Sequence, residues 1–146
     1  MFGDWKRTEQ LDLNEEFKRI TRGNLLLELL SPAFQRIIEI SFRCKTDVEA
    51  TLTIIAIFRY RQVKGSYPGN LEELATTGYL KEVPIDPFSD RPLIYRKTKD
   101  DFILYSVGLN FIDDGGESGK DRKGRPQKWS DNGDMVFWPM PQAEVR

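Results

Sequence analysis

Apolar residues recur every three or four positions through much of the first half of the chain, which is the spacing of an amphipathic helix. Ser31-Pro32 suits the start of a helix, with serine as the cap and proline at the first helical position, and no proline or glycine follows before Gly65. The pattern therefore predicts a helix over residues 31–64, roughly 50 Å long at 1.5 Å per residue. Because a small domain does not need so long a helix, we expect part of it to protrude or to pack on another molecule. Its stretch from Leu52 to Tyr60 is apolar nearly all round and is expected to form the spine of the core.

The first 30 residues are more polar and are predicted to form an extension to the domain. Asp12 and Glu15 have the spacing of a capping box, which predicts a short amphipathic helix with Leu13, Phe17 and Ile20 on one side. We expect the domain itself to cover residues 31–146.

The pattern changes after Gly65 to short segments separated by turn residues. Asn70 and Glu73 repeat the capping-box spacing and predict a short helix that ends at Gly78. Three apolar runs bounded by turns predict strands: Leu93–Arg96, Phe102–Ser106 and Met135–Trp138. The predicted fold is therefore α+β, with one long N-terminal helix packed on a small antiparallel sheet of three or four strands, and with the β region and an acidic loop over residues 66–139. The side chains expected to stabilise it are Ile54, Ile55, Phe58, Leu74, Leu80, Ile94, Phe102, Leu104 and Val136.

Composition narrows the classes of function. The 22 basic and 23 acidic residues nearly cancel, so the chain lacks the charge that nucleic-acid binding requires. Histidine is absent, which excludes the usual catalytic triads and zinc hydrolases and leaves oxygen-bound calcium or magnesium as the metals to consider. The single cysteine, Cys44, is expected to be a small core residue. The longest apolar window, Leu25–Phe34, is interrupted by polar residues and is about half a bilayer long, so no transmembrane span and no secretory signal is predicted in this chain.

A loop of more than twenty residues, from Leu109 to Gly133, holds the densest group of oxygen ligands. The candidate ligands are the carboxylates of Asp113, Asp114 and Asp131, together with Asp134 directly after the loop; Asn110, Glu117, Ser118 and Asn132 lie nearby in the sequence. Carboxylates brought together repel one another unless a cation neutralises them, and calcium accepts six to eight such oxygens in irregular geometry. From the residues alone a calcium site and a solvated acidic loop both remain open. Paired carboxylates can also perform general acid/base catalysis, but a glycine-rich loop does not favour it, so we predict no enzymatic activity.

The order of short motifs after the long helix suggests a family. In sequence they are Tyr67-Pro68, Leu71 and Leu74, Tyr79-Leu80, Pro84, Asp86-Pro87-Phe88, Tyr95, Leu104-Tyr105-Ser106-Val107-Gly108, Gly115-Gly116 and Asp131. This order resembles the soluble part of type IV pilin-like proteins, above all the major pseudopilin of type II secretion. The resemblance covers roughly the C-terminal half of the chain.

The resemblance implies a non-enzymatic structural subunit of a bacterial protein-transport assembly, on the extracytoplasmic side of the membrane. It implies a calcium ion that fixes the C-terminal loop, with Asp113 or Asp114 as early ligands, Asp131 and Asp134 as late ones, and a carbonyl of Leu109 or Asn110. The partners would be other pseudopilin-like subunits, or copies of this chain, bound through the long helix.

The family also has an uninterrupted apolar N-terminal segment, which this chain lacks. The alternative is therefore a soluble interaction domain of the same fold that forms no filaments, with a cytoplasmic location.

Overall fold

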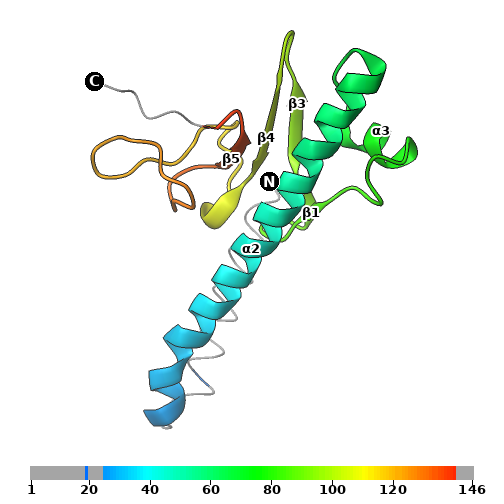
Figure 1. The fold of residues 1–146 in the computed structure, drawn as a ribbon. Coiled ribbons are helices and arrows are strands. Elements are labelled where there is room, and N and C mark those ends of the chain that lie inside the picture. Colours follow the sequence, from blue (N-terminus) through cyan, green and yellow to red (C-terminus); the bar gives the residue numbers. More distant parts are fainter. Residues whose placement is uncertain (1–18, 20–24, 141–146) are drawn as a thin grey trace.

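One helix, α2, spans Leu25–Lys64 and runs diagonally through the whole molecule (Figure 1). The structure is a computed structural model and describes residue 19 and residues 25–140. At 1.5 Å per residue the 40 residues of α2 are about 60 Å long. The helix ends as predicted at Gly65, which has a φ of 76° and donates its N–H to the Arg61 carbonyl at 2.8 Å. The predicted long helix is thus confirmed, including its C-terminal end.

The N-terminal end of α2 differs from the prediction. The helix begins at Leu25 rather than at Ser31, so Pro32 lies inside it and residues 25–30 belong to the helix instead of the extension. Proline removes one intrahelical hydrogen bond, but leucines and a glutamate, all good helix formers, precede it. The short helix predicted after Asp12 lies outside the described residues, apart from Arg19, which is helical.

The sheet lies against the C-terminal half of α2, and the N-terminal half of the helix projects beyond it (Figure 1). In the described part of the chain its strands are β3 (Ile94–Lys97), β4 (Phe102–Ser106) and β5 (Met135–Trp138), all antiparallel in the order β3-β4-β5. The predicted hairpin and last strand, and with them the α+β fold, are confirmed. A separate two-residue ribbon, β1 (Ile85–Asp86) with β2 (Arg91–Pro92), was not predicted.

Two short helices complete the described architecture. Helix α3 (Leu71–Thr76) starts at the predicted cap, where the Asn70 side chain accepts the N–H of Glu73 at 2.9 Å. The Glu73 carboxylate in turn accepts the N–H of Gly69 at 2.6 Å and the hydroxyl of Tyr60 on α2, which ties α3 to the long helix. The 3-10 helix η1 (Gly108–Asn110) follows β4 and leads into the acidic loop.

The core lies between the sheet and one face of α2, which we call the inner face. On this face Thr46, Ala50, Thr53 and Ile57 are all fully buried. Thr46, Ala50 and Thr53 are small enough for the sheet to come close. The two threonine hydroxyls donate to helix carbonyls four residues earlier. The aromatic rings that close the core are those of Phe58, Tyr67, Phe102 and Trp138.

Several predicted burial positions were right and others were wrong. Leu74, Phe102 and Leu104 are buried as expected. Ile55 is half exposed, and β5 buries Met135 and Phe137 while Val136 is only half-buried. Cys44 is exposed and is not a core residue.

Candidate functional site

Asp134 closes the acidic loop at the start of β5. Its side chain is only 3% exposed, and its two carboxylate oxygens accept the N–H groups of Asp114 at 3.2 Å and of Gly116 at 2.6 Å. Burial raises the pKa of Asp134 to about 6. The two N–H donors oppose that shift, while the negative charges of Asp113 and Asp114 add to it. The carboxylate thus joins the early end of the loop to the sheet.

Asp113 is exposed and faces β3 and β4. Its carboxylate accepts the hydroxyl of Tyr105 and the N–H of Gly115, both at 2.9 Å, and lies 3.7 Å from the guanidinium of Arg96. Burial, followed by the hydrogen bond to Asp113, raises the pKa of Tyr105, which therefore stays a hydrogen-bond donor.

The remaining predicted ligands are more scattered. The Asn110 side chain donates to the Asp114 carboxylate at 2.7 Å, and Leu109 lies between Gly108 and Asn110 in η1. Asp131 is exposed, and its carboxylate has no hydrogen bond or ion pair with any other described residue.

The structure therefore brings Asp113, Asp114 and Asp134 into one neighbourhood but leaves Asp131 outside it. Within residues 25–140 no three acidic or cysteine side chains form a group that could hold a metal ion. Asp113 and Asp134 already accept protein N–H or O–H groups on one or both oxygens, and Arg96 supplies a positive charge beside Asp113. A calcium ion at this place would have to displace these protein donors from the carboxylates, and calcium binding, which the resemblance implies, stays a prediction.

Hydrogen bonds hold the two ends of the loop together at a narrow neck. The N–H of Asp134 donates to the carbonyl of Glu117 at 2.8 Å, and the Asn132 side chain bonds to both the N–H and the carbonyl of Lys120. A Cβ on Gly119 would lie 2.4 Å from the Cβ of Ser130, and one on Gly133 would lie 2.5 Å from the nitrogen of Gly119. The neck therefore needs glycine at both positions. Beyond it, residues 120–126 fold back as a basic arm around the Asp121 carboxylate.

Asp86 is a buried carboxylate to which the sequence patterns assign no role. It is 1% exposed and accepts the N–H groups of Phe88 at 3.0 Å and Val107 at 3.3 Å. Burial raises the pKa of Asp86, and these donors act in the opposite direction. The contacts join the β1–β2 ribbon to the end of β4, which is a structural role.

The face of α2 opposite the sheet carries a long row of exposed apolar residues. Positions two apart on a helix are rotated by about 200°, so Val48 and Ile55 lie roughly opposite the buried Thr46 and Ile57. We call this row the outer seam; its members are Leu30, Phe34, Ile37, Ser41, Cys44, Val48, Thr51 and Ile55. The apolar members are 41–58% exposed.

The outer seam has the alternating four-three spacing of a coiled coil. None of its members is charged. The hydroxyl of Ser41 donates to the Ile37 carbonyl at 2.8 Å, and that of Thr51 to the Asp47 carbonyl at 2.7 Å. Because these hydroxyl protons are already used inside the helix, covering the seam would leave no unsatisfied donor. The seam is therefore suited to pack against another helix.

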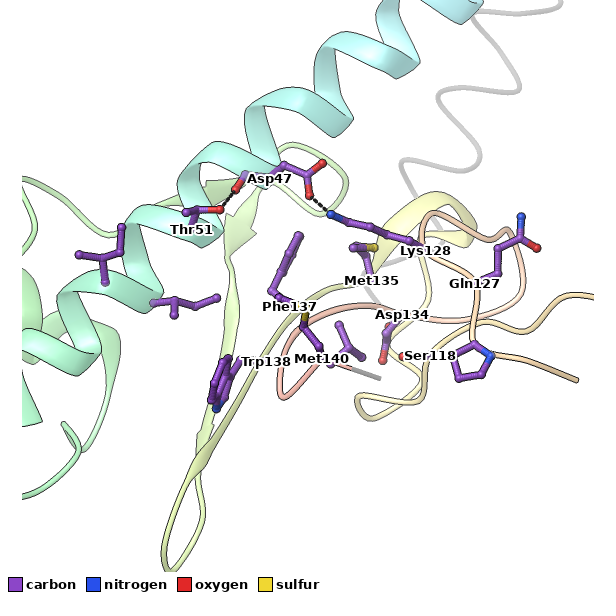
Figure 2. A pocket seen from close by; sticks show the side chains of 14 residues that line it. Asp47, Thr51, Ser118, Gln127, Lys128, Asp134, Met135, Phe137, Trp138 and Met140 are labelled. Atoms are coloured by element: carbon purple, nitrogen blue, oxygen red, sulfur yellow. Dashed lines mark hydrogen bonds and ion pairs between the residues drawn. The ribbon is translucent and has the colours of Figure 1, made fainter. Parts of the chain in front are cut away.

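A pocket of about 420 Å³ adjoins the C-terminal end of the outer seam (Figure 2). It lies between α2, β5 and the end of the acidic loop, and Thr51 and Ile55 belong to both the seam and the pocket wall. The other apolar walls come from Ile54, Met135, Val136, Phe137, Trp138 and Met140. Figure 2 shows the Lys128 ammonium directed at the Asp47 carboxylate, a 2.8 Å ion pair at the rim. The pocket can accept an apolar side chain from a molecule that lies along the seam.

Comparison of the chain with protein-family models, with curated proteins and with solved structures finds no match. In the described part of the chain no helix has the length and apolar character needed to cross a membrane.

Sequence reasoning did not identify the outer seam or the pocket. The sequence predicts that part of the long helix packs on another molecule, but α2 is apolar on two faces, so the spacing alone does not show which apolar residues face outward. The Asp47–Lys128 pair joins positions 81 residues apart, and no local pattern predicts such a contact.

Proposed function

We propose that this chain is a non-enzymatic assembly subunit, resembling a type II secretion pseudopilin, which packs through α2 against a helix of another subunit. The outer seam is the observation that carries the proposal. It is an uncharged, exposed row with coiled-coil spacing on a helix that projects beyond its own domain. Exposed apolar surfaces of this extent are uncommon on monomeric proteins and mark interaction sites.

The pocket supports the same proposal because it provides a concave end to the seam. Interfaces derive most of their binding energy from a few side chains that fill such pockets. Ile55 and Trp138 would contact the inserted side chain, and the exposed Asp47–Lys128 pair would lie at the rim, where ion pairs contribute little to affinity.

A single substitution in the seam tests the proposal. We expect the wild-type chain to associate at concentrations up to about 100 µM, measured by light scattering on a size-exclusion column. Ile55→Asp should weaken association at least about tenfold, because a charge would be buried without a partner. The melting temperature of the monomer should change little, since Ile55 is half exposed.

Arg36→Asp provides the matched control, because Arg36 is exposed on the same helix but lies off the seam. It should leave association unchanged. A wild-type chain that stays monomeric, or an Ile55→Asp variant that associates normally, would overturn the proposal.

The same measurement separates the two forms of assembly. An interface between different patches generates open-ended growth or a ring, whereas a two-fold interface closes at a dimer. Open-ended growth supports the filament subunit, and a closed dimer supports an interaction domain that forms no filaments.

A further inference from the structure

The exposed apolar surface of α2 is wider than the outer seam. Ile38 and Ile40 lie beside the seam residue Ile37 and are 52% and 47% exposed. Because they are two residues apart on a helix, they point about 160° apart, with Ile37 between them. Leu52, further along the helix, is a third exposed apolar side chain beside the seam. We call the outer seam together with these three residues the apolar band; around Ile37 it covers almost half of the helix circumference.

A single partner helix does not cover a band of this width. A two-stranded coiled coil buries a narrow stripe of alternating positions, and the positions that flank this stripe are often charged. Between residues 33 and 52 the flanking positions are Ile38, Lys45 and Leu52 on one side of the seam and Ala33, Ile40 and Asp47 on the other. Only two of these six residues are charged. The band therefore fits a helix that has a neighbour on each side of its seam.

The residues of the outer seam also favour more than two helices. Seam members alternate between two sites of a seven-residue repeat, with Ile37 at one site and Val48 and Ile55 at the other. In parallel coiled coils, isoleucine at both sites shifts the preference from two strands to three or four. The seam and its flanks thus indicate the same number of neighbours.

We infer that α2 packs in parallel and in register with at least two further copies of itself. This inference rests on the proposed function and adds the identity, number and direction of the neighbouring helices. Because the sheet lies on the side of α2 opposite the seam, copies can gather around a common axis with their domains outside. Each copy presents one flank to one neighbour and the other flank to the next. Such an arrangement forms a ring or an open filament and not a closed dimer.

The charges of the apolar band are compatible with copies in this arrangement. In parallel helices a residue on one flank lies beside the residue five positions later on the facing flank of the neighbour. Ile40 then lies beside Lys45 of the next copy, whose methylene stem can cover it. Asp47 lies beside Leu52, and its carboxylate already has Lys128 of its own chain as a partner, 2.8 Å away. No charged side chain of the band therefore meets a like charge.

A lipid surface fits the band less well than copies of the chain do. Helices that lie on membranes carry an excess of lysine and arginine on their polar face. Between Leu29 and Ile40 the charged residues of α2 are Arg36 and Glu39, one of each sign. This part of the helix therefore has no net charge with which to bind anionic lipid.

A charge exchange between positions 40 and 45 tests the inference in the full chain. We expect sedimentation equilibrium of the wild type at about 100 µM to give a mass of at least three chains. Ile40→Lys should weaken association at least about tenfold, because it places two ammonium groups side by side on neighbouring helices. Adding Lys45→Glu should recover at least about threefold of that loss. Within one helix positions 40 and 45 point about 140° apart, so only a contact between copies produces the recovery.

Gln35→Lys is the matched control, because residue 35 is exposed on the polar side of the same helix. It should leave the mass unchanged. A wild-type chain that stops at a dimer, or a double variant without recovery, would overturn the inference and leave the proposed function intact. A chain that stays monomeric would overturn both, and its binding to vesicles of phosphatidylcholine and phosphatidylserine would identify lipid as the cover.

Discussion

The inner and outer faces of α2 are built from the same stretch of sequence but have different surroundings. Between residues 46 and 57 the inner face presents Thr46, Ala50 and Thr53, all fully buried, and the outer face presents Val48 and Ile55, both at least half exposed. Large apolar side chains thus occur on both faces: Ile57 is fully buried on the inner face, whereas Val48 and Ile55 face solvent. Burial on this helix is decided by where the sheet lies and not by hydrophobicity alone.

The two faces of α2 therefore meet different demands: one packs against the sheet of its own domain, and the other is exposed. The inner face is buried because β4 and β5 pack against it, and three of its four fully buried positions, Thr46, Ala50 and Thr53, carry small side chains. On the outer face only Thr51 and Ile55 line the pocket beside β5, and Ile55 is still half exposed, so the apolar side chains of this face do not stabilise the isolated domain to a comparable extent. The proposed assembly would bury them against another subunit.

Two isoleucines, two residues apart, allow the strongest test of the contrast. Ile57→Ala should lower the free energy of unfolding by about 2–4 kcal/mol, because a fully buried side chain leaves a cavity. Ile55→Ala should lower it by less than about 1 kcal/mol, since half of that side chain is already in water. Urea denaturation of both variants measures the difference. Equal losses would show that the outer face is part of the core.

Adding volume to each face should give a smaller contrast of the same kind. Ala50→Leu places three extra carbon atoms between α2 and the sheet and should cost about 1–3 kcal/mol of stability. Val48→Leu on the outer face should stay within about 0.5 kcal/mol of the wild type. Chemical denaturation again provides the measurement, and a tolerated Ala50→Leu would contradict close packing at the inner face.

The sequence predicts an element well where polar or turn residues mark its ends and its solvent side, and poorly where they do not. Strand β4 was predicted to the residue because its apolar run is bounded by turn residues on one side and by Gly108 on the other. The face of β5 was not, since Met135–Trp138 has no polar residue to mark the solvent side. The predicted start of α2 was wrong. Ser31-Pro32 is typical of a helix start, but the leucines before it are good helix formers, and the helix begins at Leu25. In the loop, the sequence showed where carboxylates gather but not that backbone N–H groups are their partners.

The acidic loop offers a second comparison of a buried and an exposed side chain of one type, Asp134 and Asp131. The pKa of Asp134 is raised from its ordinary 3.8 to about 6, so the folded state favours the protonated form. The corresponding stability is fully present below about pH 4 and is lost as the pH rises through about 6. Asp134→Asn should remove this fall in stability, and Asp131→Asn should retain it. Thermal unfolding between pH 4 and pH 7, with an NMR titration of Asp134, provides the check; a midpoint near 4 would contradict it.

Calcium should have the smallest effect. Because Asp113 and Asp134 already have protein donors, and Asp131 lies apart, we expect the ion to change the melting temperature by less than about 1 °C. The measurement compares melting in millimolar calcium and in chelator. A rise of several degrees that Asp131→Ala and Asp134→Ala both remove would instead establish the ligand set that the family resemblance implies.

The neck at Gly119 and Gly133 has a practical consequence for engineering the protein. Since neither glycine has room for a methyl group, even alanine there would force the two ends of the loop apart. The tip of the basic arm at Gly124 has no neighbour within 4 Å of an added Cβ. An epitope tag or a fluorescent label inserted next to Gly124 would lie beyond the closed neck of the loop. It would allow the protein to be detected without disturbing either face of the long helix.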